Sequence, residues 1–232
     1  MLIAGLEKNS FVDYPGIISA VVFTKGCNMN CYYCHNRSII CPENQEDNFE
    51  TGYVLDFLHS RRNFLEGVVI SGGEPTLHLG LENFLKDIKD IGYKIKLDTN
   101  GTNPILLQKI IDKALVDYIA MDIKAPYEKY NDVCGIEINI EKIKKSIEII
   151  RKSKIEYEFR TTLVPELTED DVYSIVESIE DANTYVLQQF RTYNNKIRKK
   201  NKELLPHSSE FIKMLSERLK GKFNTCYVRG IS

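Results

Sequence analysis

The sequence has no long hydrophobic run, no strong excess of charge and no apolar leader at its N-terminus. Its uninterrupted apolar stretches are far shorter than the ~20 residues that a membrane-spanning helix requires. A formal net charge of -2 creates no field that would attract nucleic acid or an anionic membrane. We therefore expect a cytoplasmic protein with no nucleic-acid partner and no membrane partner.

The chain also lacks internal repeats at a solenoid period, and no low-complexity linker divides it. Its 232 residues, 43% hydrophobic and 28% charged, suit one soluble globular domain. We expect a single domain over residues 1–232, with an N-terminal arm over 1–18 and a βα core over 19–191. Residues 192–232 are expected to add a helix and a candidate strand around Tyr227.

Short apolar runs rich in β-branched residues alternate with segments of helical periodicity, which is typical of βα units and a parallel sheet. Right-handed crossovers would join these units. Because eight units close a full barrel, six units predict an α/β fold of the partial (β/α)6 barrel type. The predicted strands are residues 19–24, 67–71, 94–98, 118–123, 157–163 and 185–190.

Helices are predicted between these strands, and two of them carry recognisable start signals. Asn103 and Pro104 suit the N-cap and the first helical position. Thr168 and Asp171 have the spacing of a capping box. The predicted helices cover residues 53–60, 77–91, a segment from 104 onward, 140–150, 168–179 and 209–220.

Three of the six cysteines, Cys27, Cys31 and Cys34, are spaced CxxxCxxC and directly follow the first predicted strand. Three thiolates in one short loop can hold three corners of an iron–sulfur cubane, whereas a cluster ligated only by protein takes four cysteines. The spacing therefore predicts one iron with an open coordination position, as in catalytic rather than structural metal sites.

Two other interpretations of these cysteines stay open. They could be buried packing residues, or part of a zinc site completed by His35 or Cys41. Cys41, Cys134 and Cys226 are not grouped, so we expect one cluster and buried thiols elsewhere. Cysteines without a targeting segment favour a reducing compartment.

Unusual polar residues follow the carboxyl ends of the predicted strands, where parallel α/β folds build active sites. Gly72 and Gly73 would let the backbone approach a ligand where a Cβ would clash, and Glu74 and Pro75 follow them. The later strands end in Asp98 and Thr99, in Asp122 and Lys124, and in Arg191.

Asp98, Thr99 and Asp122 would place two carboxylates and a hydroxyl at neighbouring strand ends. Like charges this close raise one pKa unless a cation lies between them, and hard oxygen ligands suit a hard cation. A surface ion-pair network is the alternative interpretation. Arg160 would point into the barrel or outward, depending on the register of its strand.

Taken together, the motifs resemble those of the glycyl-radical-enzyme activases of the radical S-adenosylmethionine (SAM) superfamily. Within that group the chain is most like the activating proteins of anaerobic ribonucleoside-triphosphate reductase. The resemblance is carried by Asp13-Tyr-Pro-Gly16, the cysteine loop from Cys27 to Asn36, Ser71-Gly-Gly-Glu-Pro75, Leu97-Asp-Thr-Asn-Gly101 and Met121-Asp-Ile-Lys-Ala125.

The resemblance implies a 4Fe-4S cluster held by the three grouped cysteines, with SAM on the fourth iron. It implies that Tyr33 lies by the adenine and that Glu74 accepts hydrogen bonds from the methionyl ammonium of SAM. A monovalent cation at Asp98, Thr99 and Asp122 would bridge to the SAM carboxylate.

Further SAM contacts are implied for Gly72, Gly73 and Lys124, and Lys124 could reach the SAM carboxylate or ribose. Arg191 stands where relatives often carry a histidine near SAM. The alternative for Tyr33 is a core tyrosine, and His35 is expected to hydrogen-bond within its loop.

The same resemblance implies reductive cleavage of SAM to a 5′-deoxyadenosyl radical, which removes a Cα hydrogen from a glycine of a partner glycyl radical enzyme. A low-potential donor such as flavodoxin or ferredoxin would supply the electron. Two rival functions stay open: a radical SAM enzyme that modifies a small molecule, nucleobase or peptide, and a non-catalytic electron-transfer or metal-binding module. The basic run over residues 196–202 fits either an acidic partner or a solvated surface.

Overall fold

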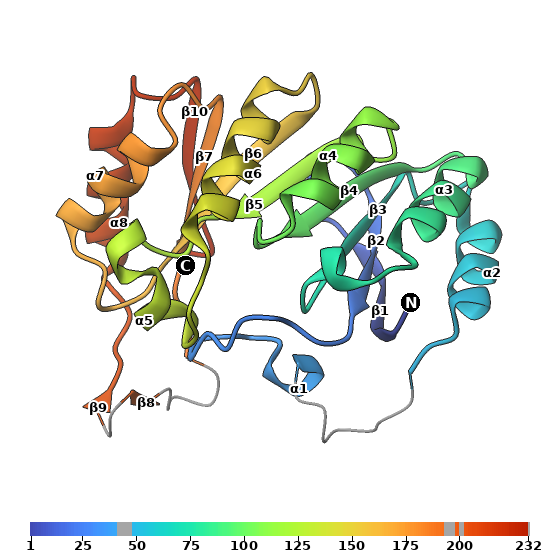
Figure 1. Ribbon diagram of the computed structural model, residues 1–232, viewed down its shortest axis with the longest axis horizontal. Coiled ribbons are helices and arrows are strands. Elements are labelled where there is room, and N and C mark those ends of the chain that lie inside the picture. The colour runs from blue at the N-terminus through green and yellow to red at the C-terminus, as the bar shows by residue number, and fades with distance from the viewer. Residues whose placement is uncertain (41–47, 193–197, 200–201, 232) are drawn as a thin grey trace.

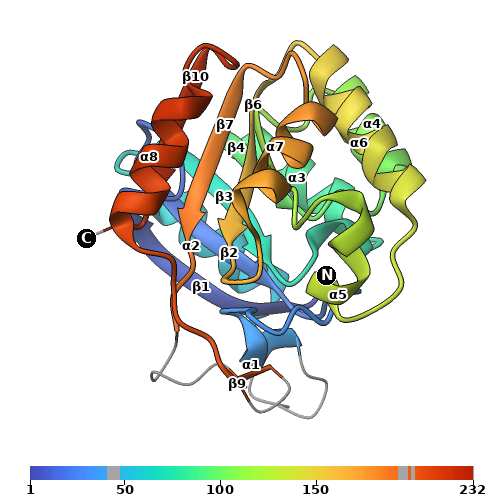
Figure 2. The same cartoon turned by 90° about the vertical axis from the view of Figure 1, so that its left-hand side faces the viewer.

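The computed structural model describes residues 1–40, 48–192, 198–199 and 202–231. A curved sheet has the strand order β1-β2-β3-β4-β5-β6-β7-β10, and helices cover its outer face (Figures 1 and 2). Its strands are β1 (Ile3–Ser10), β2 (Ser19–Thr24), β3 (Gly67–Gly72), β4 (Lys94–Thr99), β5 (Tyr118–Asp122), β6 (Glu156–Leu163), β7 (Thr184–Gln189) and β10 (Thr225–Arg229).

The predicted helices form, and the two predicted N-terminal capping arrangements are present. The Asn103 side chain accepts a hydrogen bond from the Leu106 amide at 3.2 Å, and Thr168 and Asp171 form the capping box. The helices are α1 (Arg37–Ile40), α2 (Thr51–Arg61), α3 (Leu81–Ile91), α4 (Pro104–Asp112), α5 (Tyr130–Cys134), α6 (Ile140–Lys152), α7 (Glu169–Ser178) and α8 (Ser209–Leu219), with 3-10 turns at Pro75–Leu77 and Tyr127–Lys129.

The six predicted strands pair in parallel from β2 to β7, which confirms the partial barrel. The candidate strand around Tyr227 is β10, which pairs in parallel with β7. At the other edge, β1 pairs antiparallel with β2 inside the segment expected to be an arm. That strand is hard to see in the sequence because Glu7, Lys8 and Asn9 are exposed, as is common on edge strands.

Two apolar clusters lie on the two faces of the sheet. The outer face packs Val22, Ile70 and Leu97 in the large core cluster that includes the helices. The inner face carries a smaller cluster of Tyr14, Val21, Val69, Tyr118 and Ala120. Toward the carboxyl ends of the strands the inner face becomes charged, and this charged region forms part of the candidate site.

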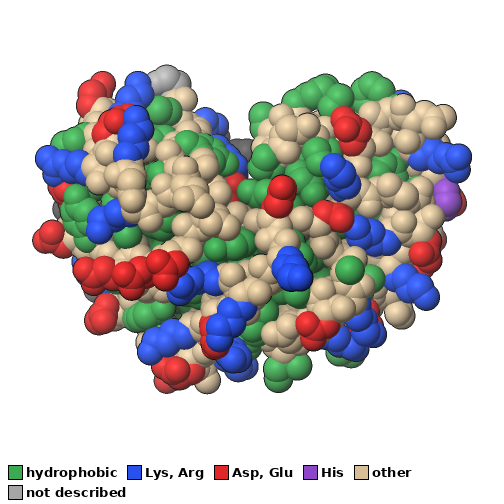
Figure 3. All heavy atoms as spheres, turned by 90° about the horizontal axis from the view of Figure 1, so that it is seen from above, with side chains coloured by type: hydrophobic (Ala, Val, Ile, Leu, Met, Phe, Trp, Pro, Cys, Tyr) green, Lys and Arg blue, Asp and Glu red, His purple; other side chains and the backbone are tan. Residues whose placement is uncertain are grey.

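The sheet does not close on itself within the described chain, since its order begins at β1 and ends at β10. From above, the surface is hollowed between two lobes (Figure 3). No helix in the described ranges is long and apolar enough to cross a membrane. Arg198–Lys199 and Lys202–Glu203 form the short antiparallel strands β8 and β9, and the rest of the basic run lies outside the described residues.

Candidate active site

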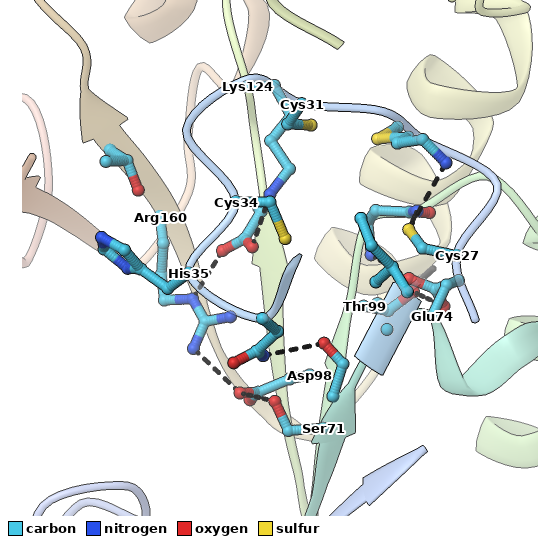
Figure 4. Close-up of a pocket in the computed structure, with 18 of the residues that line it drawn as sticks. Cys27, Cys31, Cys34, His35, Ser71, Glu74, Asp98, Thr99, Lys124 and Arg160 are labelled. Carbon is cyan, nitrogen blue, oxygen red and sulfur yellow. Dashed lines mark hydrogen bonds and ion pairs between the residues drawn. The ribbon is translucent and has the colours of Figure 1, made fainter. Parts of the chain in front are cut away.

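A cavity of about 350 Å³ lies at the carboxyl ends of the parallel strands. Cys27, Cys31 and Cys34 line it from the loop that follows β2, opposite Asp98 and Arg160 of β4 and β6 (Figure 4). The structure therefore brings the three grouped cysteines and the polar strand ends to one cavity.

Backbone contacts hold the cysteine loop, residues 25–36. The Gly26 amide donates to the Ile39 carbonyl at 3.0 Å, and the Asn30 amide donates to the Cys134 carbonyl at 2.8 Å. The Met29 amide donates to Cys27 Sγ at 3.4 Å. Hydrogen bonds from the backbone amides of Gly26, Met29 and Asn30 therefore fix the shape of the loop.

The three thiols differ in their electrostatic surroundings. Burial raises the pKa of the Cys27 thiol to about 11 and also raises the pKa of Cys34. A hydrogen bond from the Cys134 thiol lowers the pKa of Cys31 to about 7. A bound metal would supply the positive charge that buried thiolates need.

Cys134 was expected to stand alone, and the structure places it at the cluster loop. It is fully buried at the end of α5 and hydrogen-bonds to Cys31. Sequence spacing could not show this, because more than a hundred residues separate the two. Cys226 lies near Ser216 of α8, with 3.9 Å between Oγ and Sγ, and Cys41 lies outside the described residues.

Gly72 and Gly73 permit a close approach, but in the structure the approach is to the protein's own chain. A Cβ on Gly73 would lie 1.8 Å from the Gly26 carbonyl oxygen, and one on Gly72 would lie 2.3 Å from the Thr24 amide nitrogen. The Gly73 amide donates to the Thr24 carbonyl at 2.9 Å. These glycines seat the β3 loop against the start of the cysteine loop.

Glu74 is buried, and protein donors already occupy its carboxylate. Oε1 accepts from the Thr76 amide at 3.1 Å and from the Thr99 hydroxyl at 2.8 Å, and Oε2 accepts from the Asn100 amide at 2.6 Å. The Asn100 side chain in turn donates to Asn28 at 3.0 Å. Glu74 therefore ties the β3 and β4 loops together beside the cysteine loop.

Arg160 lies between the two aspartates of the site. Its Nε donates to Asp122 Oδ1 at 2.8 Å, and its Nη1 is 3.3 Å from Asp98 Oδ2. The register of β5 and β6 sets Asp122 beside Arg160 and points both inward. Burial raises the pKa of each aspartate, but the charge of Arg160, together with Lys96 at Asp98 and Lys124 at Asp122, outweighs it and holds both pKa values below the ordinary range.

Lys124 completes the charged side of the cavity. Its Nζ donates to Asp122 Oδ2 at 2.9 Å and lies 5.9 Å from the centre of the Tyr33 ring. Burial lowers the pKa of Lys124, but the negative charge of Asp122 reverses this and raises it well above its usual value. The lysine is therefore positively charged.

Tyr33 is 5% exposed and lines the cavity. Its hydroxyl has no hydrogen-bond partner among the described residues. A buried hydroxyl without a partner is costly in a folded protein. The position therefore differs from that of a core tyrosine whose hydroxyl is hydrogen-bonded.

Two predicted site residues, Thr99 and Arg191, make contacts other than those expected. The Thr99 hydroxyl donates to Glu74 and does not join the two aspartates. Arg191 donates through Nη2 to the Gly230 carbonyl at 2.9 Å and does not line the cavity. His35 was expected to hydrogen-bond within its loop, but its Nε2 lies 3.1 Å from the carbonyl of Arg191, which follows β7.

A buried ion network behind the cavity was not predicted. Glu158 is fully buried and accepts from Arg229 at 3.0 and 3.1 Å and from Tyr227 at 3.0 Å. Arg160 Nη1 lies 3.9 Å from Glu158, and Lys96 pairs with Asp98. The network thus runs across the inner face from the cavity to β10.

The donor set fits a multi-iron cluster better than a single metal ion. No three His, Cys, Asp or Glu side chains of the described residues lie close enough to ligate one ion. In a cubane each cysteine binds a different iron, so the sulfurs need not converge on a point. The contact that His35 makes with Arg191 also disfavours this histidine as a zinc ligand.

Comparison with known proteins agrees with this interpretation. The family model described as "Radical SAM superfamily" matches residues 21–179. A Methanocaldococcus jannaschii protein described as a candidate glycyl-radical enzyme activating enzyme is 36% identical over 82% of this chain and 80% of its own. A second protein of that organism, with the same description, is 29% identical over 76% of this chain and 69% of its own.

Among solved structures, TYW1 with a lysine-pyruvate adduct bound has a similar fold. The TM-score is 0.65 and the identity 21%, with 90% of this chain and 76% of TYW1 covered. The family model matches most of the chain, and the family implies a 4Fe-4S cluster and SAM as cofactors. This chain is therefore an enzyme of the radical SAM superfamily.

Proposed function

We propose that this protein is a glycyl-radical-enzyme activase, and that its partner is anaerobic ribonucleoside-triphosphate reductase. The observation that carries the proposal is the 36% identity, over 82% of the chain, to a relative described as an activating enzyme. The choice of ribonucleotide reductase rests on the resemblance of the sequence motifs.

Cys27, Cys31 and Cys34 would hold the cluster, because their thiols line one cavity on a loop shaped by backbone contacts. When bound, the cluster and SAM supply a 5′-deoxyadenosyl radical by reductive cleavage, which removes the glycine Cα hydrogen. A low-potential donor such as flavodoxin or ferredoxin would provide the electron.

The remaining residues would bind and orient SAM. Lys124 and Arg160 bring positive charge to the cavity, which suits the SAM carboxylate. The Tyr33 hydroxyl offers a buried donor that has no partner among the residues that the structure describes. Glu74 would contribute indirectly. Its carboxylate accepts a hydrogen bond from the Asn100 amide, and the Asn100 side chain donates to Cys27 Sγ at 3.9 Å, so Glu74 would help to fix the β4 loop beside Cys27.

The open side of the barrel supports a protein substrate. The sheet order leaves β1 and β10 unpaired with each other within the described chain. A glycine in a partner loop must reach the cavity, and an unclosed barrel gives such a loop a way in.

The test is anaerobic reconstitution of the cluster followed by incubation with SAM, a reductant and the reductase from the same source. We expect a glycyl-radical doublet by electron paramagnetic resonance, with 5′-deoxyadenosine formed in step with it. The reductase with its radical-site glycine changed to alanine is the control and should give no doublet.

Other outcomes separate the rival functions. 5′-Deoxyadenosine that forms only with a small substrate would support the small-molecule enzyme. A cluster whose spectrum does not respond to SAM would support an electron-transfer module. A doublet with another glycyl radical enzyme, and none with the reductase, would keep the activase and reject the proposed partner.

A further inference from the structure

The carboxylates of Asp98 and Asp122 have protein donors on all of their oxygens. Lys96 binds Asp98 Oδ1, and Ser71 Oγ donates to Asp98 Oδ2 at 3.0 Å. Asp122 Oδ1 accepts from Arg160 at 2.8 Å, and Asp122 Oδ2 accepts from Lys124 at 2.9 Å. The two aspartates therefore leave no carboxylate oxygen without a partner.

The third oxygen expected for a cation site is also in use. The Thr99 hydroxyl donates to Glu74 Oε1 at 2.8 Å, and its oxygen accepts from the Gly101 amide at 3.1 Å. In the place of a cation between the aspartates lies the guanidinium of Arg160, whose side chain is 9% exposed (Figure 4). The residues present thus do not fit a monovalent cation while Arg160 is there.

The charge of the network argues in the same direction. Its basic groups outnumber its carboxylates by one. They are Lys96, Lys124, Arg160 and Arg229 against Asp98, Asp122 and Glu158. A further cation between the aspartates would lie beside the positive charge of Arg160, and buried charges of like sign repel strongly.

We propose that the Arg160 guanidinium takes the place of the monovalent cation that the family resemblance implies, so that SAM binds this chain without added Na⁺ or K⁺. This inference rests on SAM as the ligand of the site, and it holds for any reaction that follows. Arg160 is a planar cation that can bind two carboxylates at once. Arg160 is part of the chain, whereas a bound Na⁺ or K⁺ ion would exchange with the solvent.

The test compares the wild-type protein with Arg160→Met, which keeps a long side chain but removes the charge. SAM affinity of the reconstituted protein is measured by titration in Na⁺, K⁺ and choline chloride at constant ionic strength. We expect the wild type to bind equally in all three salts. We expect Arg160→Met to bind about ten-fold more weakly in choline and to recover with Na⁺ or K⁺.

The double variant Arg160→Met/Asp122→Asn is the matched control. It removes one negative charge together with the guanidinium, so the site no longer needs a cation, and its affinity should not depend on the salt. Wild-type affinity that rises and saturates with Na⁺ or K⁺ would overturn the proposal. So would Arg160→Met protein that folds but shows no recovery with either ion.

Thermal unfolding of the protein without cluster or SAM gives a second readout. The melting temperature of Arg160→Met should rise with Na⁺ or K⁺ relative to choline, and that of the wild type should not. A wild type stabilised by Na⁺ or K⁺ contradicts the proposal even if the variant fails to fold. Because this measurement needs no partner enzyme, it is independent of the proposed activase function.

Discussion

The two sides of the cavity are built in opposite ways. The sulfur side, Cys27, Cys31, Tyr33 and Cys34, is positioned by backbone amides, and its hydroxyl at Tyr33 lacks a partner among the described residues. The charged side consists of Lys96, Asp98, Asp122, Lys124, Glu158 and Arg160. Each oxygen of its two aspartates has an ion-pair partner. The first side is arranged for a group from outside, whereas the second is complete within the protein.

This difference has a consequence for stability. Removing a member of the charged side leaves buried charges unpaired, and that is costly because ions are poorly solvated inside a protein. Removing a thiol from the sulfur side takes away a group whose main partner would be iron. The charged side should therefore govern the stability of the protein without cofactors, and the sulfur side should govern what it binds.

The largest effect is expected for Glu158→Gln, at the rear of the charged side. Glu158 is fully buried and binds Arg229, Tyr118 and Tyr227. The variant should lose about 3–5 kcal/mol of unfolding free energy, because the partly buried Arg229 loses its counter-charge and Arg160 loses one of the three carboxylates around it. Urea unfolding of the cofactor-free protein measures this.

Glu148→Gln is the matched control, because Glu148 also binds two basic residues, Lys145 and Lys152, but on an exposed helix face. Its substitution should change the unfolding free energy little, since solvent screens exposed pairs. Equal losses in the two variants would mean that burial does not distinguish the two ion networks.

A smaller effect is expected at Gly73, where the β3 loop meets the cysteine loop. Alanine there would put a Cβ 1.8 Å from the Gly26 carbonyl oxygen. Backbone must move to admit it, at a cost of about 1–3 kcal/mol. Because the displaced residue adjoins Cys27, the variant should also bind less iron after reconstitution.

Gly52→Ala serves as the control for Gly73→Ala. Gly52 lies in α2, and a Cβ there would meet nothing within 4 Å. Alanine favours a helix over glycine by about 0.5–1 kcal/mol, so this variant should be slightly more stable. Normal iron content in Gly73→Ala would show that the two loops are not mechanically coupled.

The pH dependence of stability tests the charged side from another direction. The pKa of Asp122 is held below its usual value, because Arg160 and Lys124 outweigh the effect of burial. Its ionised form therefore stabilises the fold above the ordinary aspartate pKa, and this contribution disappears as the pH falls through the lowered pKa. Asp122→Asn should cost on the order of 2 kcal/mol at pH 7.

The gap between wild type and Asp122→Asn should stay constant from pH 7 to about pH 5 and shrink below about pH 4. Urea titrations at a series of pH values measure it. A gap that widens in acid would show that Asp122 is protonated in the folded protein, opposite to the ion pairing described above.

The sequence predicts the βα core and the gathering of Cys27, Cys31 and Cys34 at one cavity, for physical reasons. Buried parallel strands are short, apolar and β-branched, so all six could be located, and the CxxxCxxC spacing is local. β1 escaped prediction because Glu7 to Asn9 interrupt its apolar pattern at the exposed edge. The contact between Cys134 and Cys31 joins distant parts of the chain, and spacing carries no information about it.

The sequence contains a pattern that predicts part of the charged network, although this pattern is not an apolar run. In Lys94-Ile-Lys96-Leu-Asp98 and Glu156-Tyr-Glu158-Phe-Arg160, charged and apolar residues alternate. Since side chains of a strand alternate between faces, this alternation places charge on the inner face of the sheet. The orientation of Arg160 follows from the same argument, whereas its position between two aspartates depends on the register of β4, β5 and β6.

The smallest effect on stability, with the largest effect on binding, is expected on the sulfur side. Cys34→Ser should change the unfolding free energy of the cofactor-free protein by less than about 1 kcal/mol. It should nevertheless bind little iron after anaerobic reconstitution, because two thiolates cannot hold the cubane.

Two other cysteines provide controls. Cys226→Ser, near Ser216 of α8, should keep its iron. Cys134→Ala should also keep its iron and its spectral response to SAM, because Cys134 contacts Cys31 and is not needed as a ligand. If Cys134→Ala lost the cluster as Cys34→Ser does, the site would have four protein ligands and no iron free for SAM.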